Sequence, residues 1–138
     1  MGTATSVKST AGAIHGQVAI ALALLSAWEH NARQNRPGPR IEEIGQDLLK
    51  LVKANIEIED LALRKVPGGV YSEDVEAFIG HLLAERLATH RSPLQLAPEG
   101  EKRLRSIIRF EAKEHRSAIF EAARALGLDT ASLVGEPG

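Results

Sequence analysis

Apolar residues follow one another along this chain in long blocks, and the first block has no polar face. Residues 18–28, VAIALALLSAW, carry no charge. They predict a helix from about Thr10 to Arg33, which ends where QNRPGPR places two prolines around a glycine. This run of 11 residues is far shorter than the roughly 20 that span a bilayer, so no membrane insertion is expected. A helix that is apolar on nearly every side is instead the buried centre of a bundle, or is shared with another subunit.

The second block repeats apolar residues at alternating steps of three and four, which predicts a helix from Ile41 to Val66. The repeating positions are Ile41, Ile44, Leu48, Leu51, Ile58 and Ala62. Asn55 occupies the step at which the repeat requires an apolar residue. A single asparagine in such a heptad seam can fix register or oligomeric state, and it can also simply lie at the solvent margin.

Two further helices are predicted in the second half of the chain. Ser72 is a suitable N-cap for a helix that continues to about Thr89, and Pro98 begins a long helix to Leu126 that Gly127 ends. Between them, SPLQLAPEG at 92–100 is either a short wing containing a strand or a proline-bounded corner, and we favour the corner. The expected fold is therefore all-α, a bundle of four main helices with a winged-helix-like corner as the alternative at 92–100.

Length and composition support one domain with an aliphatic core. A chain of 138 residues buries enough surface to fold without disulfides or a structural metal. It has no cysteine for disulfides, thiolates or zinc–cysteine sites. Aromatic residues make up only 4%, so the core must consist of Leu, Ile, Val and Ala. We expect a flexible arm at 1–9, a single helical domain at 10–128 and a flexible tail at 129–138. Cytoplasmic location is the default for such a composition.

Charge is distributed unevenly along the chain. Residues 41–85 contain four basic and ten acidic side chains, whereas residues 86–116 contain eight basic and four acidic ones. Such segments can pair within one domain or between subunits, and the basic one can also contact phosphate. The candidate phosphate-binding residues are Arg86, Arg91, Lys102, Arg103, Arg105 and Arg109.

Residues 56–108 resemble a winged-helix DNA-binding domain. The resemblance comprises a short helix IEDLALRK, a turn, a helix SEDVEAFIGHLLAERLA and the wing-like THRSPLQLAPEGEKRL. It implies that the helix from Glu73 to Thr89 would lie in the major groove of DNA. The exposed positions of this helix are mainly acidic, which would repel phosphate, so nucleic-acid contact is expected only through the basic stretch 86–116.

Enzymatic motifs are sparse. Arg109 and His115, in RFEAKEH, have a spacing similar to the Arg-to-His motif of HEPN-type helical RNases, a resemblance that implies acid–base chemistry at a phosphate. Phe110 stands where that family has a polar residue, and His115 falls on an apolar stripe, so a core or interface histidine is favoured. His81 and Glu85 could share a metal, but no third ligand is evident. We predict no catalytic residues, metal site or cofactor.

These patterns favour a non-enzymatic helical protein-interaction subunit, acting as an assembly, adaptor or regulatory component of a larger complex. Its partner is expected to be another protein or a second copy of the chain. The expected interface residues are Val18, Leu22, Leu25, Trp28 and Asn55. A winged-helix transcriptional regulator is the first alternative, and a HEPN-like RNase is the second.

Overall fold

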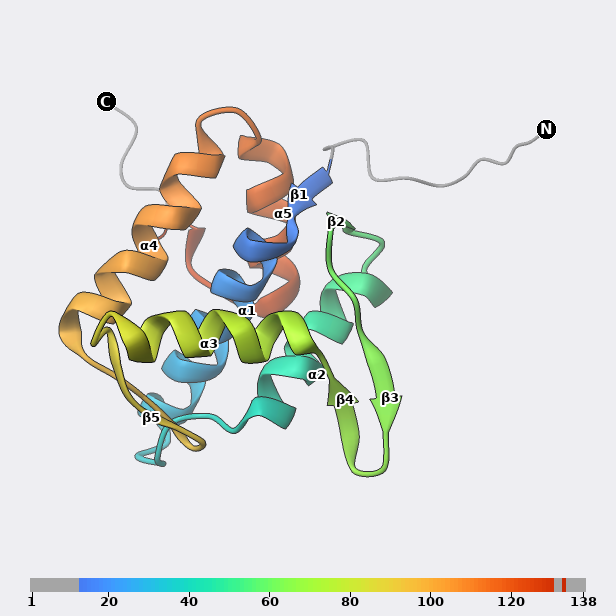
Figure 1. Ribbon diagram of the computed structural model, residues 1–138. Coiled ribbons are helices and arrows are strands. Elements are labelled where there is room, and N and C mark those ends of the chain that lie inside the picture. The colour runs from blue at the N-terminus through green and yellow to red at the C-terminus, as the bar shows by residue number, and fades with distance from the viewer. Residues whose placement is uncertain (1–12, 131–132, 134–138) are drawn as a thin grey trace.

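A computed structural model describes residues 13–130 and 133, which contain five helices and three two-stranded sheets (Figure 1). The helices are α1 (Gly16–Arg33), α2 (Ile41–Lys53), α3 (Glu73–Ala84), α4 (Pro98–Ala112) and α5 (Arg116–Leu126). The strands are β1 (Ala13–His15), β2 (Glu57–Glu59), β3 (Arg64–Val66), β4 (Gly69–Tyr71), β5 (Ala88–Arg91) and β6 (Leu94–Leu96). The fold is therefore mostly helical, and the strictly all-α expectation is wrong. The arm at 1–9 and most of the tail at 129–138 lie outside the described residues.

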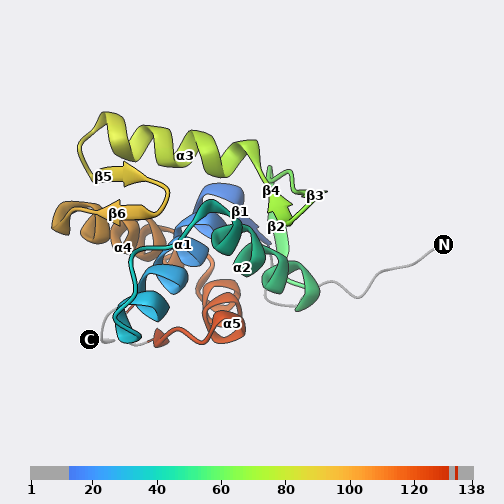
Figure 2. The same cartoon turned by 90° about the horizontal axis from the view of Figure 1, so that it is seen from below.

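Helix α1 runs through the centre of the molecule, as its uniformly apolar sequence predicts. Twelve of its eighteen residues are buried. Helices α2, α3, α4 and α5 all contact it, and Figure 2 shows them on several sides of α1. No helix of the described chain is long and apolar enough to cross a bilayer.

The first helix begins at Gly16, whereas the apolar pattern suggested about Thr10. The preceding residues instead form β1, which pairs in parallel with β2, so that Ile14 lies opposite Ile58. A Cβ on Gly16 would lie 2.7 Å from the carbonyl oxygen of Asp60, so only glycine allows this approach of the two segments.

The second helix ends at Lys53, and the prediction that it continues to Val66 is wrong. Asn55 has a φ of 64°, and the amide of Ile56 donates to the Leu51 carbonyl at 3.0 Å. This is a Schellman-type helix end, at which asparagine tolerates the left-handed conformation. Asn55 is thus a terminating residue of α2 and does not lie in a heptad seam. Beyond it the chain is extended, and the hairpin β3–β4 replaces the last expected turns.

Three local signals in the second half of the chain are confirmed. Ser72 caps α3, because its Oγ accepts hydrogen bonds from the amides of Asp74 at 3.1 Å and Val75 at 3.3 Å. Pro98 occupies the first turn of α4. Gly127 ends α5 in the left-handed conformation with a φ of 76°, and the Leu128 amide donates to the Ala123 carbonyl at 2.9 Å.

The same region contains two departures from prediction. Helix α3 ends at Ala84, and β5 and β6 form an antiparallel hairpin, so a wing-like element is present where we favoured a plain corner. The expected long final helix is divided at residues 113–115 into α4 and α5. The break lets α5 fold back, where Ala118, Ile119 and Ala122 are buried and the helix contacts α1 and α2.

Candidate docking groove

The side chains expected to form an interface on α1 are covered within the chain itself. Val18, Leu22 and Leu25 belong to the hydrophobic core, and Trp28 is half-buried against it. Asn55 is exposed, but it terminates α2 away from any seam. Because Val18, Leu22 and Leu25 are at most 4% exposed, they offer little surface to a partner, and a docking surface is better sought elsewhere on the molecule.

The candidate phosphate-binding residues lie mainly in ion pairs. Arg91 on β5 pairs with Glu76 of α3 at 2.7 Å, and Arg103 of α4 pairs with Glu85 at 3.2 Å. The remaining pairs join Lys102 to Glu99, and Arg105 to both Glu29 and Glu101. Glu76 of α3 and Glu85, which follows it, thus balance one basic residue of the wing-like hairpin and one of α4. The pairs Arg91–Glu76 and Arg103–Glu85 join the basic and acidic segments within the chain, which is one of the arrangements that the charge pattern allowed.

Arg86 and Arg109 behave differently from the other members of that set. Arg86 follows α3 with a φ of 62° and an exposed side chain. Arg109 donates to the Leu133 carbonyl at 3.1 Å, which ties α4 to the C-terminal residues. Neither joins a continuous basic face, because Glu76, Glu85 and Glu101 lie among the other cations.

The winged-helix resemblance is matched only in part by the local structure. Helix α3, the hairpin β5–β6 and α4 follow one another in the order that it implies. The segment IEDLALRK, expected as a short helix before α3, is instead the end of β2, an extended link and the start of β3. The helix that would precede the recognition helix is therefore replaced by extended chain.

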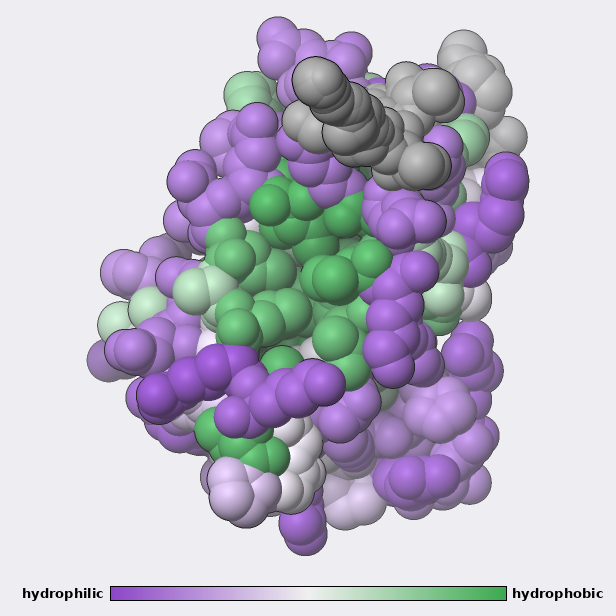
Figure 3. All heavy atoms as spheres, turned by 90° about the vertical axis from the view of Figure 1, so that its right-hand side faces the viewer, coloured by the Kyte–Doolittle hydropathy of each residue, from purple (hydrophilic) through white to green (hydrophobic). Residues whose placement is uncertain are grey.

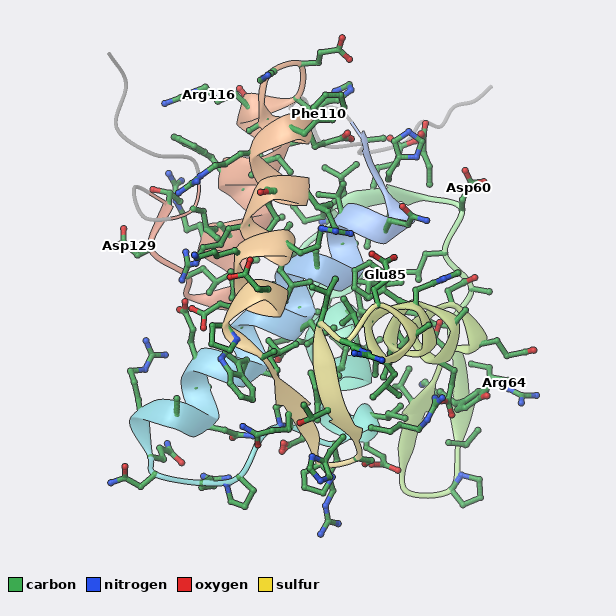
Figure 4. All side chains as sticks on the ribbon, turned by 60° about the vertical axis from the view of Figure 1, so that its left-hand side comes forward. Asp60, Arg64, Glu85, Phe110, Arg116 and Asp129 are labelled. Carbon is green, nitrogen blue, oxygen red and sulfur yellow. The ribbon has the colours of Figure 1, made fainter. Side chains whose placement is uncertain are left out.

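The residues considered for catalysis and metal binding do not form a site. His115 precedes α5 and is half-buried, while the Arg109 side chain is engaged by Leu133. Phe110 is 73% exposed, and Figure 4 shows its ring pointing away from the body of the molecule. Glu85 pairs with Arg103, and within the described residues no group of three His, Asp or Glu side chains could hold a metal ion.

An apolar groove lies between α2, β2 and the hairpin β3–β4. Its volume is about 440 Å³. The lining residues are Leu49, Val52, Ile56, Ile58, Leu61, Leu63, Arg64, Lys65 and Val70. Figure 3 views this side of the molecule, where hydrophobic side chains gather in the centre and hydrophilic ones surround them. Val52 is 46% exposed and lies within this cluster of apolar side chains.

Two structural features define the walls of this groove. A Cβ on Gly45 would lie 2.6 Å from the Val70 carbonyl oxygen, so a glycine on α2 allows β4 to pack directly on the helix. On the opposite wall, the extended link after β2 contributes the partly buried side chains of Leu61 and Leu63. The groove is thus formed by α2, by a hairpin that packs on this helix and by the link after β2.

The charged residues that line the groove are both basic. Arg64 and Lys65 belong to β3, and the Arg64 guanidinium lies 5.0 Å from the centre of the Tyr71 ring. Figure 4 shows the Arg64 side chain directed outward from the hairpin. No acidic residue is among the lining residues in the described chain. The groove therefore offers an apolar floor beside a positively charged edge.

Sequence reasoning missed the groove because it assigned 57–66 to a helix. The apolar residues of this stretch fit helical steps almost as well as they fit an extended chain. The glycine pair at 68–69 was the available signal for a hairpin, since it follows Pro67 and precedes Val70 and Tyr71. Comparisons with protein-family models, curated proteins and solved structures found no match to this chain.

Proposed function

We propose that this protein is a non-enzymatic interaction subunit, an assembly, adaptor or regulatory component, that binds an amphipathic segment of a different protein in the apolar groove. The observation that carries the proposal is the groove itself, in which Val52 remains 46% exposed beside other apolar side chains. Burial of such a surface by a partner is favourable by about 25 cal/mol for each Å² of apolar area removed from water.

The charge of the groove defines the chemistry of the partner. Arg64 and Lys65 line it, and no carboxylate among the lining residues opposes them. A segment with an apolar face and an acidic flank would complement this surface. A second copy placed on the same face would bring these cations together. The residues before position 13, MGTATSVKSTAG, are mostly small and polar with one lysine and no acid, so they do not supply the complementary chemistry.

The proposal is tested by placing a photo-crosslinking amino acid at Val52 in cells, with Ala77 on the exposed face of α3 as the control position. A protein crosslinked from position 52 alone is identified, purified and titrated against the wild-type chain. We expect Val52→Asp to abolish that binding and Ala77→Asp to leave it unchanged, because only the first places a charge in the groove. Equal binding by both variants overturns the proposal.

Light scattering tests whether a second copy of the chain, in place of a different protein, occupies the groove. A dimer of the purified chain that Val52→Asp dissociates would assign the groove to a second copy and overturn the proposed hetero-partner. A wild-type monomer, together with the crosslinked partner, supports it.

DNA binding is the second candidate, and the β5–β6 hairpin between α3 and α4 favours it, because this is the order that the winged-helix resemblance implies. Against it stand the ion pairs of Arg91 and Arg103 with acidic residues of or next to α3. Affinity for duplex DNA that falls steeply with salt and is lost on substituting Arg86 and Arg91 by Gln supports this candidate. Undetectable binding at low salt removes it.

A further inference from the structure

A polar pocket lies on a different face of α2 from the groove, between α2 and the C-terminal half of α1. Its volume is about 360 Å³, which is within the size range of small-molecule sites. Leu126 at the end of α5 and Ala27 of α1 contribute its apolar surface. The polar lining residues are Ser26, His30, Asn31, Arg33, Arg36, Glu43, Gln46, Asp47 and Lys50.

The pocket contains most of the buried polar side chains of the described chain. Among the described residues, four polar or charged ones are buried. Three of them, Ser26, Asn31 and Asp47, line this pocket. The fourth, Ser72, caps a helix. Buried polar groups are costly unless they are paired, so their concentration around one cavity distinguishes it from the apolar remainder of the core.

The two carboxylates of the pocket already have partners in the protein. Asp47 pairs with Lys50 at 3.3 Å, and Glu43 accepts a hydrogen bond from the Asn31 amide at 3.2 Å. Burial raises the pKa of Asp47 above its ordinary 3.8, while Lys50 opposes this effect. The Lys50 ammonium offsets the charge of Asp47, whereas the partner of Glu43 is a neutral amide, which offsets no charge.

The two arginines of the pocket are not matched in this way. Within residues 13–130 and 133, neither Arg33 nor Arg36 forms an ion pair with a carboxylate. Arg36 donates to the neutral side-chain oxygen of Gln34. Guanidinium groups bind carboxylate and phosphate oxygens in bidentate geometry, and such charge-assisted hydrogen bonds are stronger than neutral ones.

We propose that this pocket binds a small molecule that carries a carboxylate or phosphate group, with Arg33 and Arg36 as the anion-binding residues. The amides of Asn31 and Gln46 would orient the rest of the ligand, and Leu126 would contact its apolar part. This proposal is independent of the groove, because the two sites share no lining residue.

The test uses inorganic phosphate and citrate as probes of the two anion chemistries. Each is titrated into the full chain by calorimetry and by amide NMR, for the wild type and for the double variant Arg33→Gln, Arg36→Gln. The matched control is Arg116→Gln, because Arg116 lies at the other end of the molecule (Figure 4). Arg33 and Arg36 are exposed, so the double variant should keep the wild-type Tm.

We expect saturable binding of at least one probe, shifts confined to residues 26–36 and 43–50, and an affinity that falls by roughly tenfold or more in the double variant only. Phosphate binding alone would assign the site to phosphorylated ligands, and citrate binding alone to carboxylates. Absence of saturable binding, or equal affinity in the double variant, overturns the proposal. A single-stranded oligonucleotide is titrated as a third probe, and binding of this probe alone also overturns the proposal, because the pocket would then be part of a nucleic-acid surface.

Discussion

Two neighbouring residues of α2 test the position of the groove. Leu51 is 0% exposed and belongs to the core, whereas Val52 is 46% exposed and lines the groove. We compare Leu51→Ala with Val52→Ala. Truncation of a fully buried leucine lowers the free energy of unfolding by about 2 to 5 kcal/mol. The protein loses the burial of the removed methyl groups, and the cavity that they leave adds a further cost.

The expected cost at Val52 is much smaller. Full burial of a valine contributes about 1.5 kcal/mol at the lower end of its range, and only about half of the Val52 side chain is covered, so truncation should cost below about 1 kcal/mol. Equilibrium unfolding in urea measures both values, provided that the two variants keep the wild-type m-value. Equal costs, or a larger cost at Val52, would refute the assignment of the two faces of α2 and remove the groove.

Three further predictions concern the ends of helices and a buried acid. Ser72→Ala should lower the unfolding free energy by about 1 kcal/mol in urea titrations, because two amides of α3 lose their acceptor; an unchanged midpoint contradicts the cap. Asn55→Val should lower the free energy of unfolding by about 1 to 2 kcal/mol, whereas Asn55→Gly should not, since Asn55 has a positive φ. A higher thermal midpoint for Asn55→Val than for Asn55→Gly would contradict this backbone conformation. For Asp47, the raised pKa means that the folded state retains the proton more strongly, so stability is lost as pH rises from the ordinary value of 3.8 through the folded pKa. Asp47→Asn should therefore equal or exceed the wild type in urea midpoint at about pH 7, and its advantage should shrink at about pH 3; an advantage that grows on acidification contradicts this.

Helix ends that depend on a few adjacent residues could be predicted from the sequence. Ser72, Pro98 and Gly127 each act through their own backbone geometry or a hydrogen bond within a few residues. Such signals require no knowledge of the rest of the fold, and the structure places all three as expected. The central position of α1 was one of two outcomes expected for a helix that is apolar all round, since a second subunit could also have covered it.

Elements that depend on distant pairing could not be predicted in the same way. Strand β1 exists because Ala13 and Glu57 lie side by side across 44 positions of sequence, and nothing in either three-residue segment specifies that partner. Ile58 satisfied the helical repeat and still lies in β2, because the helix had already ended at Asn55. The period of a short apolar pattern therefore could not distinguish helix from strand once a helix end was overlooked.

The overlooked ends of the second and the last predicted helix also explain why the residues expected to dock a partner lie in the core. A long second helix and an unbroken last helix would have left part of α1 uncovered, so Leu22 and Leu25 were natural candidates for contact with a partner. The break at 113–115 returns α5 to α1, while β1 and β2 extend the cover at its start. An apolar surface that stays accessible then lies where α2 ends early, at Val52, beside the extended link that replaced its missing turns. The most hydrophobic segment of this chain is thus the one that folding covers most completely, and the groove that we propose for a partner lies where a helix stops short.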